Sequence, residues 1–445
     1  KNKMIEVIPV GGYSEVGKNM TAIKIDDEII ILDMGLYLPA VLSYEEGDPH
    51  DLSTNDLIKI GAIPNDEILR KEKEKVKAII FGHGHLDHIG AYPYLGVHYN
   101  CPVIAAPYTL QVLKFLLEEH NIHLTRRFKP MNYNSSIKIS ENIKVEFFPI
   151  THSTLQTVLV VIHTKYGNII YANDFKLDNH PVLGQKPNYD KLKKLSDNCL
   201  LLIMDSLYSN VEGKTPSEKV AREMLKDVLI GVNNKDNAII VTTFSSHIAR
   251  LKSIVEFGRS LKRKVVFLGR SLSNYVNAAE NLNLINFGKE VDIIGYRSKV
   301  KQKLIEMQKH GRNSYLIVCT GNQGEPESIL SRIARKDLPF ELLPNDIVIF
   351  SCRTIPTEMT IRNREYLEKL LKQRHVRIFT GIHQSGHASK EDHRDMINML
   401  KPKNIIPTHG DRTITKGLEI LAEEMGYKLG KNVHLLSDNK PIKIS

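Results

Sequence analysis

The sequence has few cysteines, and their positions exclude two kinds of cross-linked scaffold. There are four in 445 residues, and no two of them form a CxxC pair. A disulfide framework or a cysteine zinc site needs cysteines at close, regular spacing. We therefore expect all four to be buried as small apolar side chains: Cys101, Cys199, Cys319 and Cys352.

Long apolar runs are also missing. No run approaches the roughly 20 residues that a helix needs to cross a bilayer, and the opening KNKMIEVIPVGG lacks the apolar centre of a secretory signal. We find no internal repeat and no low-complexity segment. These absences predict a cytoplasmic protein with no membrane contact, and a chain of 445 residues predicts two domains.

Acidic residues are outnumbered by basic ones. Lys and Arg total 61 against 51 Asp and Glu, which gives a net charge of +10. This excess favours a polyanionic partner. The alternative is that the charge is spread evenly and only keeps the chain soluble.

One dense cluster of possible metal ligands follows an apolar strand in VKAIIFGHGHLDHIGAYPYL, residues 76–95. It contains His83, His85, Asp87 and His88. Imidazole and carboxylate groups bind zinc and also manganese, and a site without cysteine is typical of a catalytic rather than a structural metal. The cluster therefore predicts a catalytic metal centre.

These four side chains project in different directions and cannot all surround one ion, so we expect two metals and further ligands. His152, Asp174 and His409 each follow a predicted strand, and Asp174 is the candidate bridge. Two such ions suit hydrolysis of a phosphodiester, in which negative charge develops on oxygen. His387 is a candidate to supply or relay a proton to the leaving oxygen.

Two other patterns admit competing interpretations. Gly12 to Lys18 match a P-loop, but Asn19 replaces its final Ser/Thr and strand-like residues follow, which argues against an NTPase. Residues 206–352 alternate strands with Ser- and Gly-rich turns. Such turns bind phosphate at the carboxyl end of a parallel sheet, or they only cap helices.

Several motifs together carry a resemblance to a known family. HGHLDH at 83–88, Asp33 in ILDMG, THS and ANDF resemble the metallo-β-lactamase superfamily, and the inserted βα segment resembles its β-CASP subgroup. GGYSEVGKNM, TPSEK, TGNQGEPES, HQSGHAS and IPTHGD extend the likeness over the whole chain to the ribonuclease J family, in its short archaeal type. Leu207 and Asn173 depart from the family pattern, which commonly has Thr and Gly there.

The resemblance implies an α/β fold: a metallo-β-lactamase αββα sandwich from residues 1–205 and 353–445, with a β-CASP α/β domain at 206–352. It implies two divalent ions, zinc being expected and manganese an alternative. One ion would be held by His83, His85 and His152, the other by Asp87, His88 and His409, with Asp174 between them.

It further implies that Asp205, His387 and Asp87 act in catalysis. The residues expected to hold substrate phosphate are Ser245, Ser246, His383, Gln384, Ser385, Gly386 and His387.

The function so implied is that of a dimetal phosphodiesterase. It would degrade single-stranded RNA from 5′ to 3′, prefer 5′-monophosphate ends, release nucleoside monophosphates, and serve RNA decay and processing, with some endonuclease activity and a homodimeric assembly left open. The main alternative is a β-CASP endoribonuclease resembling RNA 3′-end processing factors. A nucleic-acid binding module without catalysis, and a β-lactamase or thioesterase, are weaker alternatives, because all ligands are present and the insertion would have no use.

Overall fold

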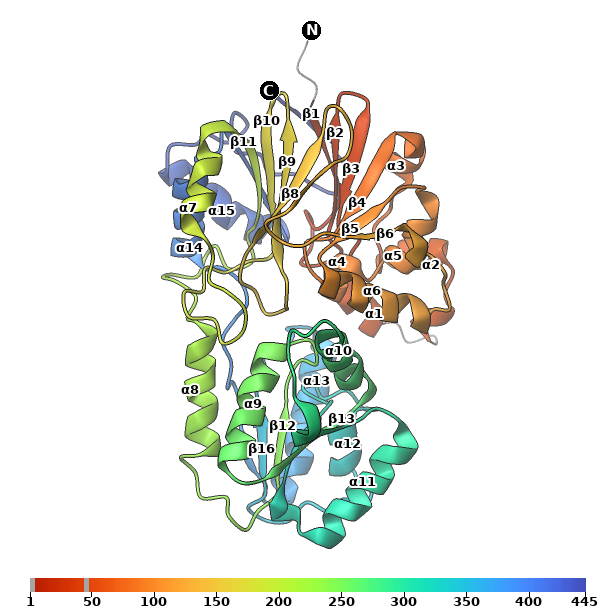
Figure 1. The fold of residues 1–445 in the computed structure, drawn as a ribbon, viewed down its shortest axis with the longest axis vertical. Coiled ribbons are helices and arrows are strands. Elements are labelled where there is room, and N and C mark those ends of the chain that lie inside the picture. The colour runs from red at the N-terminus through yellow and green to blue at the C-terminus, as the bar shows by residue number, and fades with distance from the viewer. Residues whose placement is uncertain (1–4, 44–47) are drawn as a thin grey trace. The chain divides into compact units, whose positions relative to one another are not determined.

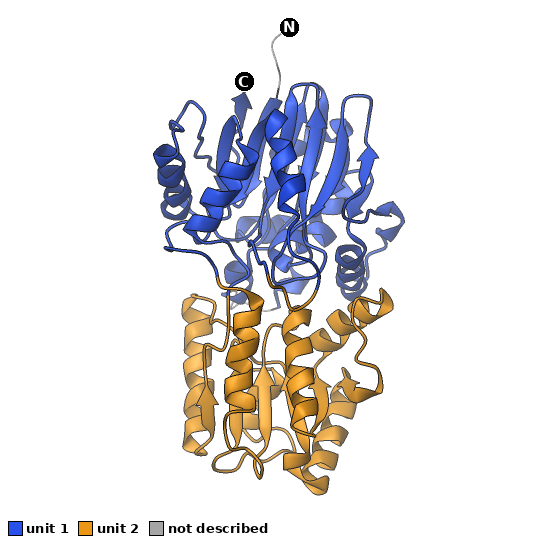
Figure 2. Cartoon of the chain, turned by 60° about the vertical axis from the view of Figure 1, so that its left-hand side comes forward, with its two compact units in different colours: residues 1–179, 184–215, 385–445 blue, residues 180–183, 216–384 orange. Residues whose placement is uncertain are grey.

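The chain folds into two compact units (Figure 2). A computed structural model describes residues 5–43 and 48–445. The first unit is drawn from residues 1–179, 184–215 and 385–445, and the second from residues 180–183 and 216–384. The second unit is therefore inserted within the first.

The first unit contains two sheets. The seven-stranded sheet has the order β19-β1-β2-β3-β4-β5-β6, and the six-stranded sheet the order β18-β11-β10-β9-β8-β7. The sequence MIEVIPV predicts a first strand from residue 4, and Met4 lies outside the described residues. The strands of the first sheet are β1 (Ile5–Gly11), β2 (Met20–Ile25), β3 (Glu28–Leu32), β4 (Val76–Ile80), β5 (Val103–Ala105), β6 (Phe128–Pro130) and β19 (Ile442–Ile444), and those of the second are β7 (Ser136–Lys138), β8 (Lys144–Pro149), β9 (Val158–Thr164), β10 (Gly167–Ala172), β11 (Cys199–Asp205) and β18 (Asn404–Thr408).

The two sheets pack face to face over an apolar core. Alternate residues of each strand point into it, for example Val145 and Phe147 of β8 against Ile30 and Leu32 of β3. This alternation follows from the two-residue period of a strand. Burial of both inner faces removes apolar side chains from water, which is the main force holding the sheets together.

Helices cover the outer faces (Figure 1). On the six-stranded sheet a second core includes residues of α7 (Tyr189–Lys194), α14 (Lys390–Leu400) and α15 (Arg412–Glu424). On the other side, α6 (Pro107–Glu119) contacts β5 and β6. The expected αββα sandwich is confirmed. The shorter helices of this unit are α1 (Leu38–Leu42), α2 (Thr54–Lys59), α3 (Glu67–Arg70), α4 (Leu86–Ile89) and α5 (Tyr92–Leu95).

The second unit is a parallel sheet with the order β14-β13-β15-β12-β16-β17, flanked by helices. Its apolar core joins the strands to α11, α12 and α13. Its strands are β12 (Ile239–Thr242), β13 (Lys264–Leu268), β14 (Val291–Ile294), β15 (Tyr315–Cys319), β16 (Ile347–Phe350) and β17 (Arg377–Phe379), and its helices are α8 (Glu218–Leu229), α9 (Ile248–Ser260), α10 (Arg270–Asn281), α11 (Arg297–His310), α12 (Ile329–Ala334) and α13 (Glu358–Gln373).

The inserted unit ends later than the boundary expected at residue 352, and it begins later than residue 206. Strand β17 pairs with β16, so the chain up to residue 384 stays in the second unit. Residues 206–215 stay in the first unit, because the amide of Ser206 bonds the carbonyl of Thr408 and the Thr215 hydroxyl bonds the carbonyl of His387. Strand pairing sets the later boundary, and hydrogen bonds to distant segments set the earlier one; local sequence reveals neither.

The cysteines lie in the interior of the protein. All four are buried and free, as predicted. Over the residues that the structure describes, none of the helices combines the length and the apolar character needed to cross a membrane.

Candidate active site

The candidate ligands lie at the carboxyl ends of neighbouring strands. Strands β3 and β4 are parallel, and so are β10, β11 and β18. Residues that follow parallel neighbours reach the same edge of a sheet, which is where such folds place their ligands. Asp33 follows β3, the segment His83–His88 follows β4, His152 follows β8, Asp174 follows β10, Asp205 ends β11, and His409 follows β18.

Three of these residues have a strained backbone. Asp33, Asp174 and His409 have φ angles of 67°, 47° and 63°. This left-handed region is uncommon for residues other than glycine, and such strain concentrates at functional sites. The chain therefore accepts a conformational cost where it presents these side chains.

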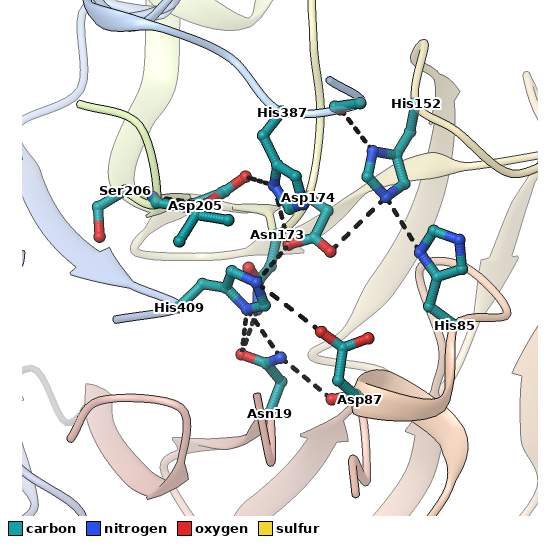
Figure 3. A network of polar contacts seen from close by, with 12 residues as sticks. Asn19, His85, Asp87, His152, Asn173, Asp174, Asp205, Ser206, His387 and His409 are labelled. Atoms are coloured by element: carbon teal, nitrogen blue, oxygen red, sulfur yellow. Dashed lines mark hydrogen bonds and ion pairs between the residues drawn. The ribbon is translucent and has the colours of Figure 1, made fainter. Parts of the chain in front are cut away.

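The first ligand set contains His83, His85, His152 and Asp174. Figure 3 labels the last three of these residues. His83 Nε2 and His152 Nε2 lie 3.3 and 3.6 Å from Asp174 Oδ2, and His85 Nδ1 lies 3.2 Å from His152 Nε2. His83 is fully buried, and neither of its ring nitrogens has a hydrogen-bond partner among the described residues. A buried imidazole Nε2 that faces a carboxylate without a hydrogen bond is suited to act as a metal ligand.

The second ligand set contains Asp87, His88, His409 and again Asp174. His88 Nε2 lies 2.9 Å from Asp174 Oδ2, and His409 Nε2 lies 3.7 Å from Asp174 Oδ1 and 3.8 Å from Asp87 Oδ2. Because Asp174 belongs to both sets, it lies where a bridge between two ions would lie. All donors are nitrogen or oxygen, which suits zinc or manganese.

Electrostatics differ between the two sets. Burial, together with neighbouring imidazoles, lowers the pKa of His83, of His152 and of His85, the last to about 3. Burial alone would lower the pKa of His88, but Asp174 and Asp87 raise it well above its usual value. The first set thus offers neutral imidazoles, the form that binds metal, whereas the carboxylates of the second set attract positive charge.

Asp205 and His387 form a pair beside the ligands. Asp205 Oδ2 accepts a hydrogen bond of 2.7 Å from His387 Nδ1, which also lies 3.9 Å from Asp174 Oδ1. Burial by itself lowers the pKa of His387, but the charge of Asp205, followed by that of Asp174, raises it to about 9. His387 is therefore protonated near neutral pH and can donate a proton.

The segment Ser385–His387 is fixed against this centre. His152 Nδ1 lies 2.5 Å from the carbonyl oxygen of Gly386, and the Lys176 ammonium donates to the carbonyl of Ser385 at 2.9 Å. A side chain on Gly386 would meet Ser153 and the His152 ring. The close approach requires glycine, and the carbonyl holds His152 in the Nδ1–H tautomer.

The other predicted phosphate-binding residues belong to the second unit. Ser245 Oγ lies 2.8 Å from Ser271 Oγ, and Gln384 Nε2 lies 3.5 Å from the sulfur of Met224. His383 Nδ1 lies 3.3 Å from the buried guanidinium of Arg250. Ser246 precedes α9 by two residues.

Sequence reasoning missed several residues of the first unit that support the ligands. They are Tyr171, Asn173 and Lys176, which surround Asp174 in the chain, and Asn19, whose glycine-rich segment was noted only as a P-loop match. Isolated polar residues within or next to buried strands were the available signal. Such residues need partners, but the sequence does not say which.

Comparisons with known proteins agree with this geometry. Family models match residues 61–209 (β-lactamase superfamily domain), 236–365 (ribonuclease J, β-CASP domain) and 373–436 (Zn-dependent metallo-hydrolase RNA specificity domain). The chain is 46% identical to ribonuclease J of Methanocaldococcus jannaschii over 98% of both chains, and 40% identical to ribonuclease J of Pyrococcus abyssi over 99% of this chain and 97% of that one. A solved structure of a protein of unknown function from Enterococcus faecalis matches 99% of this chain and 100% of its own with a TM-score of 0.64 and 18% identity, which supports the fold alone.

Proposed function

Because this chain belongs to the ribonuclease J family, we propose that it is a metal-dependent ribonuclease that degrades single-stranded RNA from its 5′ end. Its products would be nucleoside monophosphates, and its role RNA decay and processing. The observation that carries the proposal is the pair of adjoining ligand sets that share Asp174. Such paired sites suit in-line hydrolysis of phosphodiesters.

The residues present fit two divalent ions. His83, His85 and His152 would hold one, and Asp87, His88 and His409 the other, with Asp174 common to both. We propose zinc, and manganese is the alternative that the same donors accept. When bound, two such ions supply polarisation of the phosphodiester and an activated water.

The protein's own residues would manage the proton. His387 is protonated near neutral pH and is held by Asp205 at 2.7 Å. We propose that it protonates the leaving 3′-oxygen as the phosphorus–oxygen bond breaks. Before this transfer, Asp205 would hold the ring's orientation and stabilise its positive charge. Asp87, whose Oδ2 lies 3.8 Å from His409 Nε2, would orient the reacting groups.

The 5′ preference would come from a phosphate pocket. We assign to it Ser385, Gly386 and His387, next to the candidate ligands in the first unit. Ser245, Ser246, His383 and Gln384 belong to the second unit and stay a prediction of the sequence. Hydroxyl and amide donors bind a monophosphate well. A 5′-triphosphate has more bulk and charge, so we expect it to be degraded more slowly.

The test is product mapping on end-labelled RNA with the metal-loaded protein. We expect nucleoside monophosphates from 5′-monophosphorylated RNA, slower loss of 5′-triphosphorylated RNA, no cleavage of a chromogenic lactam, and loss of activity after chelation. Cleavage of circular RNA as readily as of the 5′-monophosphorylated linear form would reject the exonuclease and favour the endoribonuclease. Metal analysis of the purified protein identifies the ions.

A further inference from the structure

A run of buried hydrogen bonds lies beneath the second ligand set. It starts at His88, whose Nδ1 lies 2.7 Å from Asp33 Oδ2. The Tyr171 hydroxyl donates to the same carboxylate oxygen at 2.8 Å, and Asn173 Nδ2 lies 2.9 Å from the Tyr171 oxygen. Each of these side chains is at most 3% exposed. Solvent therefore does not reach these side chains, and only protein groups decide which atom donates and which accepts in each bond.

The run continues to the other histidine of the set. Asn173 Nδ2 also donates to Asn19 Oδ1 at 3.1 Å, and His409 Nδ1 lies 3.1 Å from that same oxygen (Figure 3). Asn19 further donates from its backbone and side-chain nitrogens to the carbonyl of Asp87, both at 3.0 Å. His88 and His409 are thus connected through Asn19, Asp33, Tyr171 and Asn173. Asn19 also holds the backbone of Asp87, the third candidate ligand of this set.

The direction of donation is determined from Asp33 outward. A carboxylate can only accept, so Tyr171 and His88 Nδ1 both donate to it. The Tyr171 oxygen then accepts from the amide nitrogen of Asn173. Both N–H groups of Asn173 are used in this way, whereas its Oδ1 is buried without a hydrogen-bond partner among the described residues. An unsatisfied buried acceptor is unfavourable, so this amide orientation is set by its donors.

The orientation of Asn173 decides that of Asn19, and through it the proton on His409. His409 Nδ1 lies 2.9 Å from Asn19 Nδ2 and 3.1 Å from Oδ1, so both atoms are within reach. If His409 Nδ1–H donates to Asn19 Oδ1, His409 Nε2 carries no proton. If His409 Nδ1 instead accepts from Asn19 Nδ2, the proton lies on His409 Nε2. Asn173 requires Asn19 Oδ1 to face it, so that oxygen also stays available to accept from His409 Nδ1–H. This donation to Oδ1 leaves His409 Nε2 free to bind a cation.

We propose that Asp33, Tyr171, Asn173 and Asn19 act as one positioning chain that gives both His88 and His409 the Nδ1–H tautomer. With the proton of each ring kept on Nδ1, both Nε2 atoms could bind the same cation beside Asp174. Partners of this kind commonly change metal affinity by 10–100-fold when removed. The inference rests on the metal centre of the proposed function, but not on its substrate.

The test compares metal binding in conservative variants. Tyr171→Phe removes one hydroxyl, and Asn173→Asp removes both amide donors without changing shape. The matched control is Tyr99→Phe, which loses a similar buried 2.7 Å bond from tyrosine to the carboxylate of Asp66. Calorimetric titration of each metal-free protein with zinc measures the number and affinity of the sites.

We expect two tight sites in the native protein and in Tyr99→Phe. In Tyr171→Phe and Asn173→Asp, one site should keep its affinity and the other should weaken by about 10–100-fold. Selective ¹⁵N-histidine spectra of the metal-free proteins, with the His409 signals assigned by their loss in His409→Gln, should show a shift of the proton from Nδ1 toward Nε2.

Each contrary result has a distinct meaning. Two unchanged sites in both variants, or an unchanged His409 tautomer, overturn the positioning chain. A native protein with fewer than two sites overturns the metal centre and the chain together. Two native sites without RNA cleavage reject the proposed ribonuclease activity and leave the positioning chain intact.

Discussion

Histidines that are neighbours in this site differ in protonation because their partners differ. His85 is surrounded by other imidazoles and has its pKa lowered to about 3 through burial and the adjacent His83. His387 faces Asp205 and has its pKa raised to about 9 despite burial. The same residue type is thus neutral in one place, as a metal ligand must be, and protonated in the other, as the proposed proton donor must be.

The first prediction concerns Asp205→Asn. Its carboxylate is the largest influence that raises the pKa of His387, so its neutralisation should lower that pKa. A proton donor is active below its pKa, and therefore the alkaline limb of the kcat–pH profile should move to lower pH by about one unit or more. An unchanged limb would assign the proton to another group.

His387→Ala serves as the control for that profile. It should remove the limb and lower kcat by about 10²–10⁴, while the metal content of the protein stays the same. Loss of an ion in this variant would make His387 a ligand instead.

The second prediction concerns a proton shared by two carboxyl groups. Burial, and then the nearby Glu15, raise the pKa of Asp438 to about 8, and Asp438 Oδ1 accepts from the amide of Tyr13 at 3.0 Å. The folded chain holds this proton above pH 4 and the unfolded chain does not, so stability falls as pH rises from about 4 to 8.

Asp438→Asn imitates the protonated form and should cancel this decline. We expect equal stability near pH 4 and a gain of about 1 kcal/mol at pH 9, which is about 2–4 °C in Tm for a domain of similar size. Thermal melts at the two pH values measure it. An equal gain at both values would point to a cause other than the proton.

At the scale of the element, helix α11 (Arg297–His310) has an uneven charge. It contains Arg297, Lys299, Lys301, Lys303 and Lys309 against the single acid Glu306. Its buried residues Val300, Leu304 and Met307 turn one face toward the core. The spacing of 297, 301 and 309 places three cations along the exposed side, beside Tyr296, which is 75% exposed.

The third prediction concerns the exposed cations of α11. Replacing Arg297, Lys301 and Lys309 with Gln should weaken binding of long single-stranded RNA at low salt. If all three contact phosphate, the slope of log affinity against log salt should decrease by about 2. The control replaces Lys191, Lys193 and Lys194 of α7 with Gln, because these also are three exposed cations on one helix. Equal slopes in both variants would assign the effect to net charge alone.

At the scale of the whole molecule, the proposed metal centre would connect distant segments of the first unit. Its candidate ligands extend from His83 to His409, and β18 must pair with β11 before His409 can approach Asp174. A ligand that binds only the folded state stabilises it, by about 2.7 kcal/mol at 100 times its dissociation constant.

The fourth prediction is therefore a local effect of chelation. Removing metal should speed amide hydrogen exchange in β10, β11 and β18 of the first unit and leave β12, β15 and β16 of the second unit unchanged. His83→Ala should show a smaller response to chelation than the native protein. A uniform response in both sheets would contradict a centre confined to the first unit.

The sequence by itself determined what depends on near neighbours along the chain. The spacing of His83, His85, Asp87 and His88 identified metal chemistry, since four donors within six positions are rarely accidental. Alternating apolar residues predicted strands, and the polar residues that follow those strands made His152, Asp174 and His409 candidates for further ligands. These signals are local because strand period and ligand spacing are local properties.

Only the tertiary structure decided what depends on pairing between distant segments. Strand β17 joins the inserted sheet through β16, which moved the boundary from 352 to 384. Asn19, Tyr171 and Asn173 meet Asp33 and His409 because the start of β2 and the ends of β3, β10 and β18 lie at one edge of the sandwich. A single buried polar residue has no period and does not name its partner, so a hydrogen-bond network of this kind becomes visible only when the sheets are assembled.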